Sequence, residues 1–323
     1  MIENYPFTHL WITDSSLHAR CVYSYLVLAA VNSQRLMLGT AVVHPYTRHP
    51  AINVNSIATV ADISDGRTIL GLGAGDSPTT ELGFQPSKVS VLRDMIAVAH
   101  KLLDGQSVDF RNEAFTLSQA RLHWSNGKKI PIYMACSGPR MLALAGEMAD
   151  GALVLCGAFP EAITYAYERI AAGAKSAGRS VDEIDVWFML YGSIKTDSEE
   201  AYAESRSLAA WFSFRAPHYC KLAGFSESLV NKIKATYTGG EFHLAEEAAK
   251  LTPDEMVEKF TVGGTPQQIV ERVRSLLQVG VKSVNFFPIG TKRTSSIEFF
   301  AQQVIPALAP PTSRGKQPDA VRE

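Results

Sequence analysis

The stretch that decides the fold is TILGLGAGD, residues 68–76. Its first residues are mostly apolar on both alternating faces, as in a parallel strand that is buried between two layers. Glycines at 71, 73 and 75 then let the backbone turn sharply or pass close to a ligand, and Asp76 closes the segment. A buried strand that ends in a glycine-rich tip predicts an α/β fold in which functional groups follow the strand.

The same pattern extends outward along the chain. Apolar runs that read as strands occupy residues 10–13, 36–43, 68–73, 131–136, 151–155, 184–191 and 281–287. Helical segments are expected after them at 17–31, 50–63, 87–103, 139–148, 160–177, 266–279 and 295–308. Strands that alternate with helices indicate βα units and a parallel sheet. We therefore predict a barrel of the TIM (β/α)8 type, although such a barrel closes with eight strands and the sequence displays seven.

Two segments interrupt this rhythm. Residues 105–130 read as an irregular excursion, with a hairpin around Arg111, Asn112 and Glu113. Residues 198–260 read as a mainly helical insertion before the last strand. We expect a single barrel domain over residues 1–309 and a disordered tail, rich in proline and charge, over residues 310–323.

Composition excludes several classes of protein. The 323 residues are 46% hydrophobic and 20% charged, close to the average for globular proteins, and the net charge of −1 gives no basis for binding nucleic acid or an anionic membrane. No apolar run is long enough to span a bilayer, and the first residues lack the features of a signal peptide. The four cysteines (Cys21, Cys136, Cys156 and Cys220) are widely spaced, with no CxxC pair. We expect a cytoplasmic protein with reduced thiols and no bound metal.

In a barrel, function gathers at the carboxyl ends of the strands. The tip after the third run holds Gly73, Ala74 and Gly75, whose successive N–H groups can form an anion-binding nest. The alternative is a tight turn that binds nothing. The spacing is not that of a dinucleotide-binding motif, and no nucleophile elbow, phosphate-binding loop or zinc-binding helix occurs elsewhere. We favour contact between this tip and a ligand.

The tip after the fourth run is Cys136-Ser137-Gly138-Pro139. Pro139 stands where a helix would begin, so the free N–H groups of that helix and the Ser137 hydroxyl suit a phosphate. The alternative is an ordinary helix cap. Cys136 lies inside an apolar strand, which is more typical of a buried, inert thiol than of a nucleophile.

Polar side chains also follow the first two runs. His44 and Arg48 lie in the loop after the second run, where Arg48 is either a solvated charge or a forked partner for a carboxylate or phosphate. His44 and His49 have no acidic or cysteine partner at ligand spacing, so we expect no metal there. Asp14 follows the first run and is either a helix N-cap or a polar floor to the pocket.

Taken in order, these tips resemble those of a known family. The motifs are GTAV (39–42), PYTRHP (45–50), ISDGR (63–67), GLGAGD (71–76), IPIYMA (130–135), SGP (137–139), ADGA (149–152) and VGGTP (262–266). Their order resembles the luciferase-like monooxygenase superfamily, and most closely its branch with the methylenetetrahydromethanopterin reductase that uses coenzyme F420. The resemblance covers residues 7–308.

The resemblance implies a TIM barrel with a flavin or deazaflavin across the carboxyl ends of its strands. The favoured activity is F420-dependent hydride transfer to or from a small organic substrate. An FMN-dependent monooxygenase is the alternative, followed by a non-catalytic flavin-binding or partner subunit.

The resemblance also implies roles for individual residues. A cis peptide between Ala41 and Val42 would support the back of the cofactor ring. The cofactor-binding residues would be Asp14, Ala41, Val42, Gly73, Ala74, Gly75, Cys136, Ser137, Gly138 and Pro139. Asp76 would be the catalytic acid–base. From their place in the loop after the second run, we expect His44 and Arg48 to bind the substrate.

Two features depart from the family pattern. Some members carry a catalytic histidine where this chain has Ser15, so we expect a mechanism without it. Residues 3–7 align with the end of the family's first helix, so its initial βα unit is absent from this sequence. Either the natural start lies upstream of Met1, or the barrel has a seam with two unpaired strand edges. We expect a homodimer or higher homo-oligomer in either case.

Overall fold

A computed structural model describes residues 2–15, 17–124, 127–237 and 245–308 of the chain. The tail predicted to be disordered, residues 310–323, lies outside the described residues. Within the described ranges, every helix is too short or too polar to cross a bilayer.

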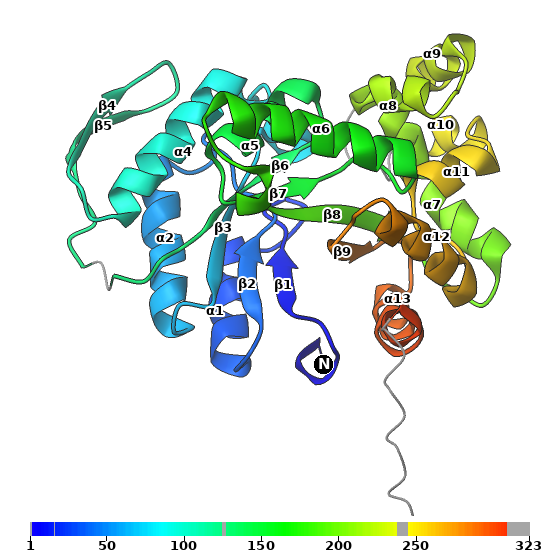
Figure 1. Ribbon diagram of the computed structural model, residues 1–323, viewed down its shortest axis with the longest axis horizontal. Coiled ribbons are helices and arrows are strands. Elements are labelled where there is room, and N and C mark those ends of the chain that lie inside the picture. Colours follow the sequence, from blue (N-terminus) through cyan, green and yellow to red (C-terminus); the bar gives the residue numbers. More distant parts are fainter. Residues whose placement is uncertain (1, 16, 125–126, 238–244, 309–323) are drawn as a thin grey trace, which may run out of the picture.

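Seven parallel strands form one curled sheet that resembles a half-barrel (Figure 1). In sheet order they are β1 (His9–Ile12), β2 (Met37–Thr40), β3 (Thr68–Leu72), β6 (Ile132–Cys136), β7 (Gly151–Val154), β8 (Asp185–Gly192) and β9 (Ser283–Pro288). Each strand pairs in parallel with its neighbour in this order. The seven predicted strands are confirmed, because strands buried between two layers are apolar along their whole length and stand out in the sequence.

Helices follow the strands and cover the outer face of the sheet. They are α1 (Val22–Asn32), α2 (Pro50–Ile63), α4 (Val89–Leu103), α5 (Pro139–Met148), α6 (Pro160–Ser176) and α12 (Pro266–Gln278). Several have a proline in the first turn, where a missing N–H costs nothing. Two predictions need correction: α1 begins at Val22 rather than at residue 17, and the five-residue helix α3 (Ser77–Glu81) follows β3 where no helix was expected.

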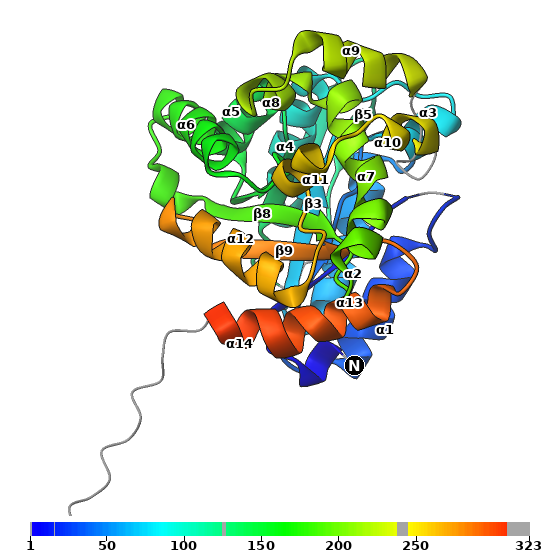
Figure 2. The same cartoon turned by 90° about the vertical axis from the view of Figure 1, so that its right-hand side faces the viewer.

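The two predicted interruptions are confirmed as elements of their own. Strands β4 (Val108–Arg111) and β5 (Thr116–Ala120) pair antiparallel as a hairpin. The insertion consists of α7 (Ser198–Arg215), α8 (Pro217–Leu222), α9 (Glu227–Thr236), α10 (Glu246–Lys250) and α11 (Asp254–Phe260). After β9 the chain forms α13 (Arg293–Phe299), one π-helical turn and α14 (Ile305–Leu308), which run together as one rod beside β9 (Figure 2).

The sheet does not close among the described residues. β1 pairs with β2 alone, and β9 pairs with β8 alone, so the two strands are the edges of an open seam. Every residue of both strands is partly exposed, whereas the central strands β3 and β7 are buried throughout. The concave face of the sheet holds a small cluster of its own: Ile69, Tyr133, Leu153 and Met189.

Candidate active site

The tips of β2 and β3 are joined through a bulge. The peptide between Ala41 and Val42 is cis, as the family resemblance implies. Beside it, the Thr40 hydroxyl accepts the Gly71 N–H at 2.8 Å and donates to the Gly71 carbonyl at 2.9 Å. The ladder resumes where the Val43 N–H donates to the same carbonyl at 3.0 Å. Residues 41 and 42 therefore leave the ladder with β3, although the Ala41 N–H still donates to the Ile12 carbonyl, and both pack toward the concave face.

Two glycines of the β3 tip are required by close contacts. A Cβ at Gly73 would lie 2.4 Å from Val42 Cγ2, so only glycine lets the tip approach the bulge. Gly75 has φ +84°, and a Cβ there would meet the Thr79 hydroxyl at 2.2 Å. The tip thus lies against both the bulge and α3.

Asp76 is held by the end of the helical insertion. Its Oδ1 lies 2.5 Å from Nη2 of Arg215, the last residue of α7. The Asp76 side chain is 43% exposed and that of Arg215 is 26% exposed. Asp76 therefore has a fixed partner and stays accessible from solvent.

Ser137 is held by the next turn of the same insertion. Its carbonyl accepts a hydrogen bond from the Tyr219 hydroxyl at 2.9 Å. His218 lies beside it: burial lowers the pKa of this imidazole, and a hydrogen bond with the Ser137 backbone opposes that effect. Arg215 contacts the β3 tip and α8 contacts the β6 tip, so the two tips lie on one rim. We call this set, residues 73–79, 136–140 and 215–219, the rim.

The rim concentrates buried polar atoms that have no partner. Among the residues that the structure describes, five side-chain atoms are in this state, and four belong to the rim: Thr79 Oγ1, Ser137 Oγ, Arg215 Nε and His218 Nε2. A buried donor or acceptor left unpaired costs about 1–3 kcal/mol, so such atoms are rarely left alone by chance. Their gathering at two strand tips points to a polar ligand.

The start of α5 supports the phosphate interpretation of the β6 tip. Gly138 occupies the N-cap position, and no side chain caps this helix. Gly138 therefore stands at the cap position, as the cap alternative expected, while the Ser137 hydroxyl does not cap the helix and is buried without a partner. Cys136 is buried, as expected for a residue inside an apolar strand, and burial raises the pKa of its thiol.

Asp14 and Arg48 bind each other. Arg48 donates from Nη1 to Asp14 Oδ2 at 2.5 Å and from Nη2 to Oδ1 at 3.1 Å. The N-cap interpretation of Asp14 is wrong, because α1 begins only at Val22 with Cys21 at its N-cap. The interpretation of Arg48 as a solvated charge is also wrong, because its forked partner is a carboxylate of this chain.

The His44 side chain forms its hydrogen bonds within its own loop. The ring is buried, Nδ1 accepts the Tyr46 N–H at 3.4 Å, and Nε2 lies 3.2 Å from the Thr47 hydroxyl. Burial lowers the pKa of this imidazole. His44 and Arg48, both predicted to bind substrate, therefore also shape the loop that carries them.

Sequence reasoning missed the residues that the helical insertion brings to the rim. These are Arg215, His218 and Tyr219, with Thr79 from α3. The only sequence signal was the run RAPHY (215–219), in which three polar side chains surround a helix-breaking proline.

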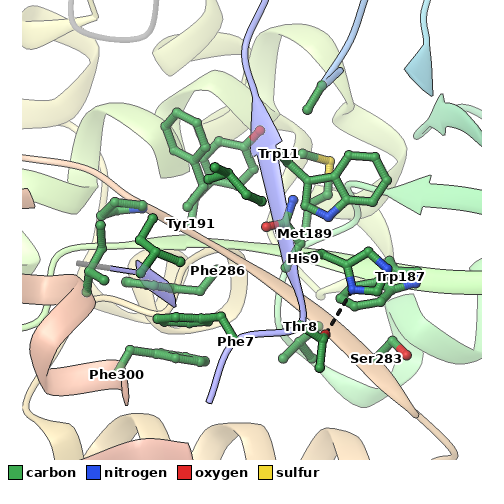
Figure 3. Close-up of a pocket in the computed structure, with 18 of the residues that line it drawn as sticks. Phe7, Thr8, His9, Trp11, Trp187, Met189, Tyr191, Ser283, Phe286 and Phe300 are labelled. Atoms are coloured by element: carbon green, nitrogen blue, oxygen red, sulfur yellow. Dashed lines mark hydrogen bonds between the residues drawn. The ribbon is translucent and has the colours of Figure 1, made fainter. Parts of the chain in front are cut away.

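An aromatic-lined cavity of about 470 Å³ lies in the seam (Figure 3). Trp11, Trp187 and Tyr191 line its inner wall. On the outside, the ring of Phe300 stacks on Phe286 at 4.4 Å and on Phe7 at 6.4 Å between centroids. Of the predicted site residues, Ala41 alone lines this cavity. The seam cavity therefore reaches the Ala41–Val42 bulge, but none of the rim residues lines it.

Comparison with known proteins agrees with this architecture. Residues 1–283 match the family model described as luciferase-like monooxygenase. The 5,10-methylenetetrahydromethanopterin reductase of Archaeoglobus fulgidus is 33% identical over 316 residues, which cover 95% of this chain and 93% of the relative. The F420-dependent glucose-6-phosphate dehydrogenase of Nakamurella multipartita is 28% identical over 320 residues, covering 95% and 89%.

A solved structure extends the likeness to three dimensions. The coenzyme F420-dependent tetrahydromethanopterin reductase of Methanopyrus kandleri superposes with a TM-score of 0.80 at 30% identity, over 94% of this chain and 92% of that one. All three proteins are reductases or dehydrogenases, and two are named as F420-dependent.

Proposed function

Since the chain belongs to the luciferase-like monooxygenase family, we propose that it is an oxidoreductase that binds coenzyme F420 and transfers hydride to or from a small organic substrate. The observation that carries the proposal is the gathering of unpartnered polar atoms beside the bulge. An FMN-dependent monooxygenase on the same fold is the alternative.

The residues present fit a deazaflavin with a phosphate. Ala41 and Val42 pack toward the concave face, where the family resemblance puts the ring, and Gly73 and Gly75 keep the neighbouring strand tip close. The Ser137 hydroxyl and the first N–H groups of α5 suit the phosphate. Backbone atoms of Cys136, Gly138 and Pro139 complete that segment.

When bound, F420 supplies the ring that gives or accepts the hydride. The chain's own residues orient that ring and move the proton. Asp76 holds or releases a proton at its carboxylate, and Arg215 fixes the orientation of that carboxylate. Asp14 forms the polar floor through its pair with Arg48, and His44 and Arg48 hold the loop on the substrate side.

A titration tests this proposal. Purified protein is added to F420 and, separately, to FMN, and quenching of the ring fluorescence is followed. We expect saturable quenching of F420 at lower protein concentration than of FMN. Tighter binding of FMN would favour the monooxygenase, and binding of neither would refute a cofactor-dependent oxidoreductase.

We place the protein in the cytoplasm and as a homodimer. The four cysteines are free thiols, three of them buried, which suits a reducing compartment. Tyr25, Leu28 and Val31 recur every third residue on α1 and are 41%, 55% and 59% exposed. Exposed apolar side chains gathered in this way mark interaction surfaces.

A second copy of the chain is the occupant that we propose for this surface. Sedimentation of the wild type should give a dimer, and the double variant Leu28→Glu, Val31→Glu should give a folded monomer. A wild-type monomer at micromolar concentration would overturn the assignment.

A further inference from the structure

The seam cavity is bridged by aromatic rings on both sides of the sheet. On the inner side, the ring centroids of His9 and Trp187 lie 4.4 Å apart, and those of Trp11 and Trp187 lie 6.4 Å apart (Figure 3). On the outside, the two ring stacks of Phe300 join β9 to the segment before β1. An extended chain segment would have to displace both bridges, because its side chains alternate between the two sides. The space therefore suits a compact ligand better than an eighth strand.

The walls of the cavity are mainly apolar. Its volume of about 470 Å³ falls in the range of roughly 300–1,000 Å³ that small-molecule sites occupy. Trp11 lines it, and the buried Nε1 of this indole has no hydrogen-bond partner among the described residues. An indole N–H can only donate, so a pure hydrocarbon would leave it unsatisfied. A ligand that also carries an acceptor fits these walls better.

The charged side chains that line the cavity are basic. Its lining, which consists of described residues, includes Lys282 and Arg293 but no aspartate or glutamate. Lys282 also lines a neighbouring pocket together with Asp182 and Glu183, so carboxylates lie on its other side. Arg293, the first residue of α13, is exposed and forms no ion pair in the part of the chain that the structure describes. The cavity therefore combines an apolar interior with a cation that has no counterion.

We propose that the seam cavity is a second ligand site and that it takes an apolar carboxylate. The hydrocarbon or aryl body would lie between the aromatic rings, and the ionised carboxyl group would bind Arg293. A carboxylate accepts hydrogen bonds and carries one negative charge, which complements both an unpartnered donor and an uncompensated cation. None of the rim residues lines this cavity, so the inference goes beyond the proposed function and does not depend on it.

The test compares three compounds that share one skeleton and differ in charge. These are 4-phenylbutyrate, 4-phenylbutan-1-ol and 4-phenylbutylamine, each titrated into the wild type by calorimetry. We expect the acid to bind most tightly, the alcohol about threefold to fivefold more weakly, as for an exposed ion pair, and the amine most weakly. Equal affinity for all three, or no binding of the acid, would overturn the proposal.

A charge variant locates the carboxyl group. Arg293→Gln should lower the affinity for 4-phenylbutyrate to that for the alcohol and leave the affinity for the alcohol unchanged. The matched control is Lys234→Gln, because Lys234 is an exposed cation on α9 that does not line the cavity. The control should leave all three dissociation constants unchanged. An equal effect of both variants would show that the acid senses only the overall charge of the protein.

A volume variant locates the body of the ligand. Ile297 lines the cavity from α13, and Ile297→Phe adds ring volume there. This variant should weaken the acid and the alcohol alike. Unchanged binding to it would place the ligand outside the seam. Circular dichroism shows whether the variant folds, and if it does not, the exposed Arg293→Gln decides.

A competition experiment separates the seam from the rim. Saturating F420 should leave the affinity for 4-phenylbutyrate unchanged, and mutual exclusion would move the ligand to the cofactor site and overturn the proposal. If the wild type binds no F420, the proposed function fails, and the calorimetric comparison of the three compounds and the variants still decides this one.

Discussion

The rim and the seam are two places where the curled sheet exposes its interior, and their chemistry differs. The rim is built from the glycine-rich β3 tip, the β6 tip, an ion pair and four buried polar atoms without partners. The seam is built from aromatic side chains around a cavity, with Trp11 Nε1 as its one unpartnered buried atom among the described residues.

The difference teaches that volume alone does not locate chemistry. An apolar wall has no hydrogen-bonding group that a ligand must satisfy. An unpaired buried donor, in contrast, costs free energy until a ligand accepts its hydrogen bond. The seam has the volume of a small-molecule site, but the rim has the groups that orient a charged cofactor. We therefore propose that the seam contributes stability and that the rim binds the cofactor.

The largest expected effect is a loss of stability from a substitution in the seam that leaves the rim unchanged. Phe300 is 3% exposed and stacks on both Phe286 and Phe7. Phe300→Ala should lower the free energy of unfolding by about 3–5 kcal/mol, because it leaves a cavity in an aromatic stack. Denaturant unfolding measures this loss, and F420 affinity of the folded fraction should stay the same.

Phe110→Ala is the control for Phe300→Ala. Phe110 stacks on Phe115 in the hairpin but is only partly buried. Phe110→Ala should cost clearly less stability. A large loss of F420 affinity in Phe300→Ala would show that the seam takes part in cofactor binding.

The next effect is on turnover. Asp76→Asn retains the shape but removes the titratable proton, so the rate constant of the catalysed reaction should fall about 100-fold or more. The dissociation constant of F420 should change far less. The measurement is the initial rate at saturating F420 with a substrate that the wild type converts, and equal rates across the active pH range would remove the acid–base role.

A smaller effect concerns the unpartnered hydroxyl. Ser137→Ala should weaken F420 binding about tenfold through loss of a hydrogen bond to the phosphate. The free energy of unfolding without cofactor should stay equal or rise, because an unsatisfied buried group is removed.

Ser205→Ala is the matched control. Ser205 is buried, and its hydroxyl donates to the Ala201 carbonyl at 2.8 Å. This variant should lose stability by about 1 kcal/mol and keep F420 affinity. The opposite pattern, in which Ser137→Ala destabilises the protein and leaves F420 binding unchanged, would make Ser137 a structural residue.

The sequence predicted the seam and the two strand tips of the rim, but it did not predict the residues that α3 and the helical insertion add to the rim. The strands were found because parallel strands buried on both faces are continuous apolar runs. The tips were found because glycines and Ser137 follow such runs directly. α3 was missed because five residues are too few for a helical period to show.

Arg215 and His218 could not be assigned from the sequence, because Arg215 is far along the chain from its partner Asp76 and His218 is far from Ser137, and both contacts depend on packing of the insertion. Asp14 was misjudged as a possible cap for a similar reason. Its true partner, Arg48, lies on another loop, and the contact depends on how β1 and β2 are paired.

Hydrogen–deuterium exchange with and without F420 tests the central claim most directly, because it compares the rim and the seam in one experiment. We predict that F420 slows exchange in peptides covering residues 73–79 and 136–142, and in the segment around residues 215–219, while residues 9–12 and 283–288 keep their rates. Protection confined to the seam peptides, with none at the rim, would contradict the account.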